Sequence, residues 1–156
     1  LISDTGLRLS EALGLIKEDI VLDTEIPHLI IQEHPWRKLK TASSERLVPL
    51  IGKSYWAAGQ IMQIEGQFAF SNYTSPSKCN ANSASAALNK WLKPRVPDGC
   101  VVHSFRHALR DRLRAVECPS DISDAIGGWS TSGIGHSYGD GYDLVVKQKW
   151  LQKIVI

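Results

Sequence analysis

The sequence has few cysteines, no apolar run long enough to cross a membrane, and no set of carboxylates spaced to hold Mg²⁺. Its three cysteines, at positions 79, 100 and 118, lack the spacing of zinc ligands. Their odd number favours free, buried thiols in a reducing cytoplasm over disulfides. No stretch approaches the ~20 apolar residues that span a bilayer, and no phosphate-binding P-loop is found. We therefore expect a fold without metal or cofactor, and no membrane partner.

A chain of 156 residues suits one compact domain, and a hydrophobic content of 43% is typical of a globular protein. The net charge is only +2, but the charges are segregated. Basic residues gather in segments 36–53 and 90–114, whereas acidic residues are denser near 18–33. This pattern is typical of a nucleic-acid face, and an ordinary solvated surface explains it equally well. The DNA contacts predicted from it are Arg37, Lys38, Arg46 and Arg110.

Apolar periodicity predicts an α+β fold that is mainly α, with one small antiparallel sheet. Helices are predicted over residues 7–17, 54–65, 81–93, 103–116, 120–126 and 142–156. Strands are predicted over 27–32, 36–40 and 46–50, the last two around a polar turn. In the helix at 103–116, one apolar stripe is formed by Phe105, Leu109, Leu113 and Val116. Residues 1–6 read as the end of a helix already under way, so we expect that an N-terminal portion is missing.

Two arginines from distant segments are candidates for holding one phosphate. Arg106 lies three residues after His103 in a predicted helix, so both face the same way. Arg8 follows a Thr-Gly break at the start of another helix, where free N–H groups also favour an anion. Guanidinium groups can clamp a phosphate through paired hydrogen bonds that lysine cannot copy. Glu11 can orient Arg8, and a plain salt bridge between the two is the alternative.

A proton donor is also predicted. Lys40 ends a predicted strand and suits the protonation of a leaving alkoxide. Lys38 alternates onto the same strand face and is its rival for this role. Trp129 carries an indole N–H that can donate to a phosphate oxygen, although a tryptophan beside glycines is more often part of a core.

The candidate nucleophile is Tyr138, which lies in a segment with six glycines between residues 127 and 141. A phenol has a pKa of about 10 and attacks poorly unless it is activated. Positive charge from the arginines and Lys40 would favour the phenolate, and His103 can accept the proton. Tyr142 is the competing candidate.

Taken together, these segments resemble the catalytic domain of the tyrosine recombinases, the phage integrase family, from Thr5 to Tyr138. The segment T-G-L-R-L-S-E is similar to the family's first-arginine box and gives Arg8 and Glu11. The segment K-T-x-x-S-x-R-x-V-P-L is similar to its β-hairpin lysine box and selects Lys40 over Lys38. The segment H-S-F-R is similar to the H-x-x-R box that supplies His103 and Arg106.

The last box of the family is a His or Trp after glycine, followed nine residues later by the tyrosine. Trp129 and Tyr138 fit this spacing, and Tyr142 does not. His136 also follows a glycine, but no tyrosine lies nine residues beyond it. The resemblance therefore assigns Trp129 and Tyr138, with His136 as a lesser candidate.

The resemblance implies a site-specific recombinase, or integrase, that cuts DNA by tyrosine attack on a phosphodiester. The products are a 3′-phosphotyrosyl bond and a free 5′-hydroxyl, and strand exchange and rejoining need neither metal nor ATP. Residues 1–156 would be the catalytic domain, without the family's N-terminal core-binding domain. The implied partners are double-stranded attachment or recombination sites, three further subunits in a tetramer, and accessory DNA-bending proteins. Residues 142–156 could exchange between subunits.

Two alternatives stay open at the level of sequence. A type IB topoisomerase-like enzyme would use the same chemistry to relax supercoils without synapsis. A non-catalytic remnant of an integrase would bind DNA and cut nothing, although all the active-site positions are occupied. Each version acts on chromosomal or phage DNA in the cytoplasm.

Overall fold

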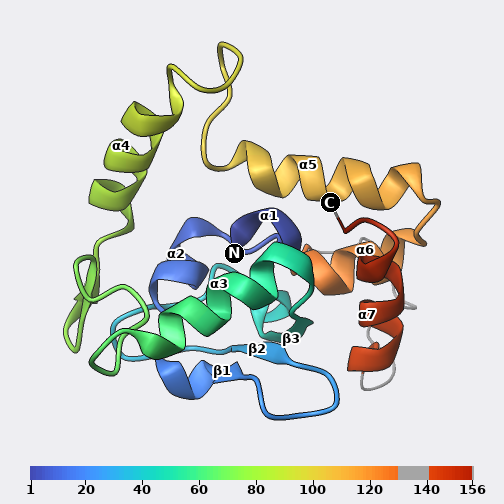
Figure 1. The fold of residues 1–156 in the computed structure, drawn as a ribbon, viewed down its shortest axis with the longest axis horizontal. Coiled ribbons are helices and arrows are strands. Elements are labelled where there is room, and N and C mark those ends of the chain that lie inside the picture. The colour runs from blue at the N-terminus through green and yellow to red at the C-terminus, as the bar shows by residue number, and fades with distance from the viewer. Residues whose placement is uncertain (130–140, 156) are drawn as a thin grey trace.

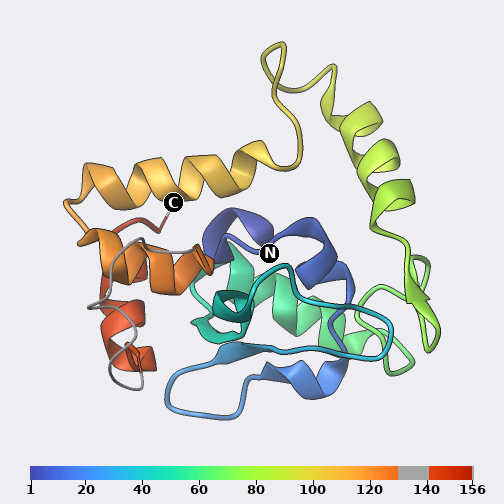
Figure 2. The ribbon, with the colours of Figure 1, turned by 180° about the vertical axis from the view of Figure 1, so that it is seen from behind.

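In the computed structural model, which describes residues 1–129 and 141–155, a small three-stranded sheet lies along one edge of the molecule and the α-helices lie beside it (Figures 1 and 2). The helices are α1 (Ile2–Thr5), α2 (Leu9–Leu13), α3 (Gly52–Gln63), α4 (Ala81–Leu92), α5 (Ser104–Ala115), α6 (Ser120–Gly127) and α7 (Leu144–Gln152). Two 3-10 turns cover Lys17–Asp19 and Ala42–Ser44. The predicted α+β, mainly helical architecture is confirmed. Within the described residues, each helix is too short or too polar to span a bilayer.

The sheet is antiparallel and has the order β1 (Ile20–Val21), β2 (His28–Ile31), β3 (Arg46–Pro49). Leu29 of β2 is paired with Ile20 on one side and with Val48 on the other. A separate two-stranded hairpin joins β4 (Thr74–Ser75) to β5 (Lys78–Cys79), within a stretch that the sequence predicts as a loop.

The predicted strand over residues 36–40 is wrong. This stretch makes only an isolated bridge between His34 and Arg37. The side chain of Arg37 is buried and donates from Nη1 to the carbonyl of Gln32 at 2.5 Å. It lies so close to Gly14 that a Cβ at that glycine would come within 2.6 Å of its Nε. The chain therefore turns inward here instead of extending along the sheet.

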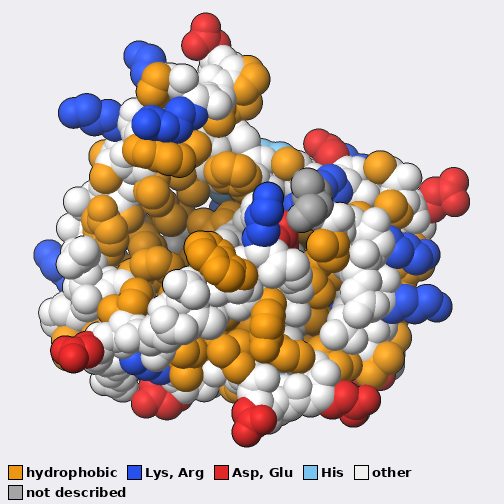
Figure 3. Space-filling view, in the orientation of Figure 1, with side chains coloured by type: hydrophobic (Ala, Val, Ile, Leu, Met, Phe, Trp, Pro, Cys, Tyr) orange, Lys and Arg blue, Asp and Glu red, His pale blue; other side chains and the backbone are white. Residues whose placement is uncertain are grey.

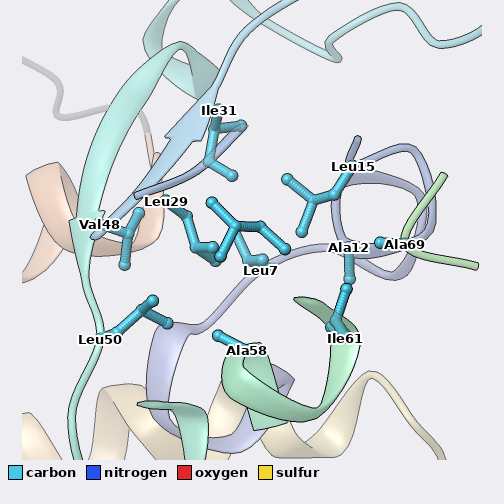
Figure 4. Packing of buried hydrophobic residues seen from close by; sticks show 11 residues of the cluster. Leu7, Ala12, Leu15, Leu29, Ile31, Val48, Leu50, Ala58, Ile61 and Ala69 are labelled. Carbon is cyan, nitrogen blue, oxygen red and sulfur yellow. The ribbon is translucent and has the colours of Figure 1, made fainter. Parts of the chain in front are cut away.

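The main core lies between the sheet and the N-terminal helices (Figure 4). Its members are Leu7, Ala12, Leu15, Ile20, Leu29, Ile31, Val48, Leu50, Ala58, Ile61 and Ala69. Leu7 is 1% exposed and lies next to Arg8 in the chain. Burial of such a side chain stabilises the fold by roughly 1.5–3 kcal/mol, and here it also fixes the backbone from which Arg8 extends.

A second core joins α5, α6 and α7 around Leu109, Leu113, Ile126 and Leu151. Helix α5 also packs on α1, and Gly6 makes this approach close. Gly6 ends α1 with φ +64°, and a Cβ there would lie 2.5 Å from the Leu109 side chain. Glycine is required both for this backbone conformation and for the space. The predicted break at Thr5-Gly6 is confirmed, and it brings the Gly6 carbonyl against α5.

Helix α4 lies at one edge of the molecule, where it packs on α2 (Figures 1 and 2). Apolar side chains surround a hollow beside it, visible in Figure 3, with a volume of about 320 Å³. Phe105 lines this hollow and is 39% exposed, unlike Leu109 and Leu113 of the same predicted stripe, which are fully buried. The stripe prediction therefore holds for Leu109, Leu113 and the partly buried Val116, which packs against the second core, and is wrong for Phe105. All three cysteines are free, but only Cys118 is buried, so the expected burial is wrong for Cys100, which is exposed.

Candidate active site

Arg8 is anchored at the start of α2 by the carboxylate of Glu11. The Arg8 backbone N–H donates to Glu11 Oε2 at 2.9 Å, and its Nη1 donates to Oε1 at 2.6 Å. Nη1 also donates to the Ser44 hydroxyl at 3.0 Å, and Nη2 to the Gly128 carbonyl at 3.2 Å. The side chain keeps 19% of its surface exposed. The salt bridge to Glu11, predicted as the alternative to an orienting role, is therefore also the contact that orients Arg8.

Arg106 reaches the same place from α5. Its Nη1 donates to the carbonyl of Gly6 and, at 2.5 Å, to that of Gly127. The residue is 2% exposed, and its buried Nη2 has no hydrogen-bond partner within the described residues. Gly127 and Gly128, which bind the two arginines, are consecutive. Since neighbouring Cα atoms are about 3.8 Å apart, the two guanidiniums lie within roughly 10 Å of each other.

Their proximity has an electrostatic effect on Arg106. Burial lowers the pKa of its guanidinium, and the like charges of Arg8 and Arg46 lower it further, to about 10. Arg106 still carries its charge at neutral pH. A cation held among other cations favours an anion at this place, and the unpartnered Nη2 retains a donor for one.

His103 lies at the N-terminal end of α5, exposed, with its ring edge-on to that of His107 at a centroid distance of 4.9 Å. Partial desolvation lowers its pKa, and the positive charges of His107, Arg106, Arg8 and Lys40 lower it further. At neutral pH the imidazole is therefore neutral and can accept a proton. Lys40 is exposed, just before the Ala42–Ser44 turn, and its charge acts on His103 from a distant segment. The structure thus brings Arg8, Arg106 and His103 to one side, with Lys40 within electrostatic range.

The indole ring of Trp129 makes cation–π contacts with two guanidiniums. The ring lies 4.4 Å from the Arg106 guanidinium carbon and 4.9 Å from that of Arg110. Gly128 ends α6 with φ +62°. The backbone N–H of Trp129 then donates to the Asp124 carbonyl at 3.0 Å. Cation–π contacts of this kind hold a guanidinium in place, so Trp129 orients Arg106. Its predicted role as a hydrogen-bond donor to phosphate stays a prediction.

Arg46 belongs to the interior of the site and not to the DNA-facing surface that its basic segment predicted. Its side chain is 3% exposed and donates to Glu11 Oε2 at 3.0 Å, to the Ser44 carbonyl at 2.5 Å and to the Ile126 carbonyl at 2.9 Å. It ties β3 and α6 to the carboxylate that holds Arg8. Strand alternation carries the signal, because Arg46 lies on the same face of β3 as the buried Val48.

Two of the predicted DNA contacts are therefore corrected. Arg37 and Arg46 are buried and bound to the protein's own oxygens, so neither offers its charge to a duplex. Lys38 is exposed and pairs with Glu33 at 3.2 Å, and Arg110 is partly exposed and pairs with Asp124 at 3.0 Å. For these two residues, DNA contact stays a prediction.

Tyr138 and His136 lie outside the described residues. The competing tyrosine is described: the Tyr142 hydroxyl donates to the carboxylate of Asp121. This hydrogen bond raises the pKa of Tyr142, and desolvation and the carboxylate charge act in the same direction. The Tyr142 phenol is thus held in its protonated, weakly nucleophilic form.

Glu11 gives the first testable prediction, which concerns stability. The carboxylate is 1% exposed and pairs with Arg8 and Arg46, so Glu11→Ala leaves a buried guanidinium without its counter-ion. We expect the free energy of unfolding to fall by about 3–5 kcal/mol, measured by urea denaturation. Glu45→Ala, which removes an exposed carboxylate nearby, should change it by less than about 0.5 kcal/mol. Equal small changes in both variants would contradict the role given to Glu11.

The same residue predicts a pH dependence. Burial acts to raise the pKa of Glu11, but the Arg46 charge and hydrogen bonds from Arg46 and Arg8 outweigh it, so the pKa is lowered. A lowered folded-state pKa adds stability above the unfolded value of about 4.3, and this stability is lost as the pH falls through the folded value. The stability difference between the wild type and Glu11→Ala should therefore shrink in acid. A difference that grows below pH ~4 would contradict this sign.

The fold is similar to that of a transposon integrase in solved structures. One Tn1549 transposon integrase structure, in complex with a circular intermediate DNA, matches 87% of this chain with a TM-score of 0.58 and 16% identity. A second, with transposon right end DNA, matches 98% with a TM-score of 0.56 and 16% identity. A third, with circular intermediate DNA, matches 95% with a TM-score of 0.53 and 18% identity.

The chain spans 54–56% of the length of these integrase chains. The sequence matches no family model, and no curated protein matches it. At this identity the likeness shows the fold, and it confirms the fold that the sequence motifs predicted.

Proposed function

We propose that this chain is the catalytic domain of a site-specific DNA recombinase of the tyrosine integrase type. One observation carries the proposal: Arg8 and Arg106, 98 residues apart in the chain, bind the consecutive carbonyls of Gly128 and Gly127. After desolvation, the charges of Arg106, Arg8 and Lys40 lower the pKa of His103, so these groups lie within electrostatic range of it. Cationic and proton-carrying groups are thus gathered as a phosphodiester would require. The fold likeness to an integrase solved with DNA supports the same conclusion.

In the proposed reaction, the Tyr138 hydroxyl attacks the phosphorus of a DNA phosphodiester. A Tyr138 oxygen–phosphorus bond forms, the bond from phosphorus to the 5′ oxygen breaks, and the phosphate stays on the protein as a 3′-phosphotyrosine. His103 takes the proton of the phenol, for which its lowered pKa keeps it neutral. Lys40 gives a proton to the leaving 5′ oxygen. Attack by a 5′-hydroxyl of another strand reverses these steps and rejoins the DNA.

The arginines supply the electrostatic part of this mechanism. Charge builds on the phosphate oxygens in the transition state, where fixed donors in a water-poor site are most effective. Arg106 is fixed by two carbonyls and the Trp129 ring, and Arg8 by Glu11 and Ser44. Both guanidiniums are thus held in fixed orientations before a phosphate arrives. The proposed substrate is duplex DNA, and exchange between two duplexes implies a tetramer of subunits.

The proposal is tested by covalent capture from a pool of duplexes of random sequence, each carrying a nick in one strand. In some members of the pool, the nick lies a few nucleotides to the 3′ side of the phosphate that is cleaved. After cleavage at such a site the short fragment leaves, so the rejoining step is lost and the adduct accumulates. We expect a protein–DNA adduct that survives denaturation, forms in EDTA, and yields a recurrent cleaved sequence. DNA binding without any adduct across the pool would contradict the proposal and favour a non-catalytic DNA-binding protein.

Proton uptake on DNA binding gives a further prediction. Desolvation and then the nearby cations lower the pKa of His103, and a bound phosphate neutralises the cations, so DNA raises this pKa toward its ordinary value and the complex takes up a fraction of a proton. Binding should therefore tighten as the pH falls through the range of His103. Calorimetry of the uncleaving Tyr138→Phe chain in two buffers of different ionisation enthalpy measures the uptake. It should vanish in the additional variant His103→Gln, and an unchanged uptake there would contradict the assignment.

A further inference from the structure

His107 lies one helical turn after His103 on α5, and the mechanism proposed above does not use it. Both imidazoles are exposed, and their ring centroids are 4.9 Å apart with an angle of 80° between the planes. Residues four apart on a helix lie on the same face, so this pair is held together by the backbone itself. Two imidazoles so placed form a bidentate donor set.

The donor chemistry selects the class of ligand. Neutral imidazole suits Zn²⁺, Ni²⁺ and Cu²⁺, and does not suit Mg²⁺ or Ca²⁺. Zinc bonds imidazole nitrogen at about 2.0–2.1 Å, which places the ring centres of two ligands of one ion roughly 5–6 Å apart. The observed centroid spacing of 4.9 Å is just below this range.

We propose that His103 and His107 chelate one Zn²⁺ or a similar divalent transition-metal ion. Among residues 1–129 and 141–155, no third His, Cys, Asp or Glu completes a three-ligand group with them, so water or an anion fills the other positions. The ion is an external ligand of the surface and not a structural metal. Because His103 cannot coordinate zinc and accept a proton with the same nitrogen, the bound ion blocks the proton acceptor. This inhibitory consequence rests on the proposed function, whereas the binding itself does not.

The surroundings of the pair give the metal site an unusual salt dependence. Arg106, Arg8 and Lys40 place positive charge close to His103, and this charge repels a dication. Salt screens the repulsion, so raising the ionic strength should tighten zinc binding. A pair of histidines beside carboxylates would show the opposite dependence.

Calorimetric titration of the chain with zinc acetate tests the binding. We expect one ion per chain, an affinity that rises with potassium acetate concentration, and at least tenfold weaker binding in His107→Gln. Two matched variants should bind as the wild type does: Cys100→Ser, which removes the exposed thiol three residues before His103, and His28→Gln, which removes a histidine of β2. Unchanged affinity in His107→Gln, or loss of binding in Cys100→Ser, would overturn the site.

The same variants separate this proposal from the recombinase proposal. His107 is exposed, so His107→Gln should fold normally and still form the covalent adduct. Zinc should suppress adduct formation in the wild type and much less in His107→Gln, and EDTA should restore it. Equal suppression in both would overturn the inhibitory role. Absence of any adduct even in EDTA would instead defeat the recombinase proposal, and the titration would still decide the metal site.

Discussion

Replacement of Tyr138 by phenylalanine will abolish the covalent protein–DNA adduct while duplex binding persists. The phenol oxygen is the atom that bonds to phosphorus in the proposed reaction, and phenylalanine has no oxygen to take its place. We expect the loss to be complete within the sensitivity of a denaturing gel, with affinity for an intact duplex changed less than about threefold. The salt dependence of binding should also be unchanged, because the phosphate contacts that release counter-ions are kept.

The matched control for this experiment is Tyr142→Phe. The Tyr142 hydroxyl is engaged with Asp121, and its raised pKa keeps it protonated. We expect this variant to form the adduct at close to the wild-type rate. An adduct that persists in Tyr138→Phe and disappears in Tyr142→Phe would reverse the assignment of the nucleophile.

Arg106→Lys will slow cleavage by about 10²–10³-fold, the typical effect of removing one fixed donor from a transition-state oxyanion. Lysine keeps the charge but lacks the planar fork that binds the Gly6 and Gly127 carbonyls and leaves Nη2 for a phosphate. It also loses the flat contact with Trp129. Single-turnover capture rates at saturating DNA measure this effect separately from binding.

Arg112→Lys controls for the loss of a guanidinium from α5. Arg112 lies on the same helix and also donates to backbone carbonyls, those of Ser3 and Ile154, away from the proposed site. Its replacement should reduce stability and leave the single-turnover rate of the folded protein within about threefold. If the two variants lose rate equally, the effect of Arg106 is a general weakening of α5 and not an action on phosphate.

The helical part of the fold was accessible from the sequence because its helices are periodic. Helices α3 and α5 match the predicted segments within about two residues, since apolar spacing fixes which face is buried. The stretch 36–40 could not be predicted, because its conformation depends on a tertiary contact. Arg37 enters the space left by the missing side chain of Gly14, 23 positions earlier, and no local pattern indicates that approach.

The site could be predicted as a set of residues but not as a network. The motifs named Arg8, Glu11, His103 and Arg106, and the structure brings these to one place. The arginines are held mostly by backbone carbonyls, those of Gly6, Gly127 and Gly128. A backbone acceptor leaves no mark in the type of residue, so the sequence does not indicate these contacts. Arg46 was misjudged because a basic residue in a basic segment suggests a surface, whereas its strand face places it beside Glu11.

The central claim is that the guanidinium of Arg8 acts on the charge of the DNA phosphate being cleaved. It is tested most directly by replacing that phosphate with a methylphosphonate. In this group a methyl replaces one non-bridging oxygen, so the linkage keeps both ester bonds but has no negative charge. On the natural phosphate, Arg8→Ala should reduce the single-turnover rate by about 10²–10³-fold. On the methylphosphonate, the account predicts wild-type and Arg8→Ala rates within about threefold of each other. An undiminished deficit on the neutral substrate would contradict the account.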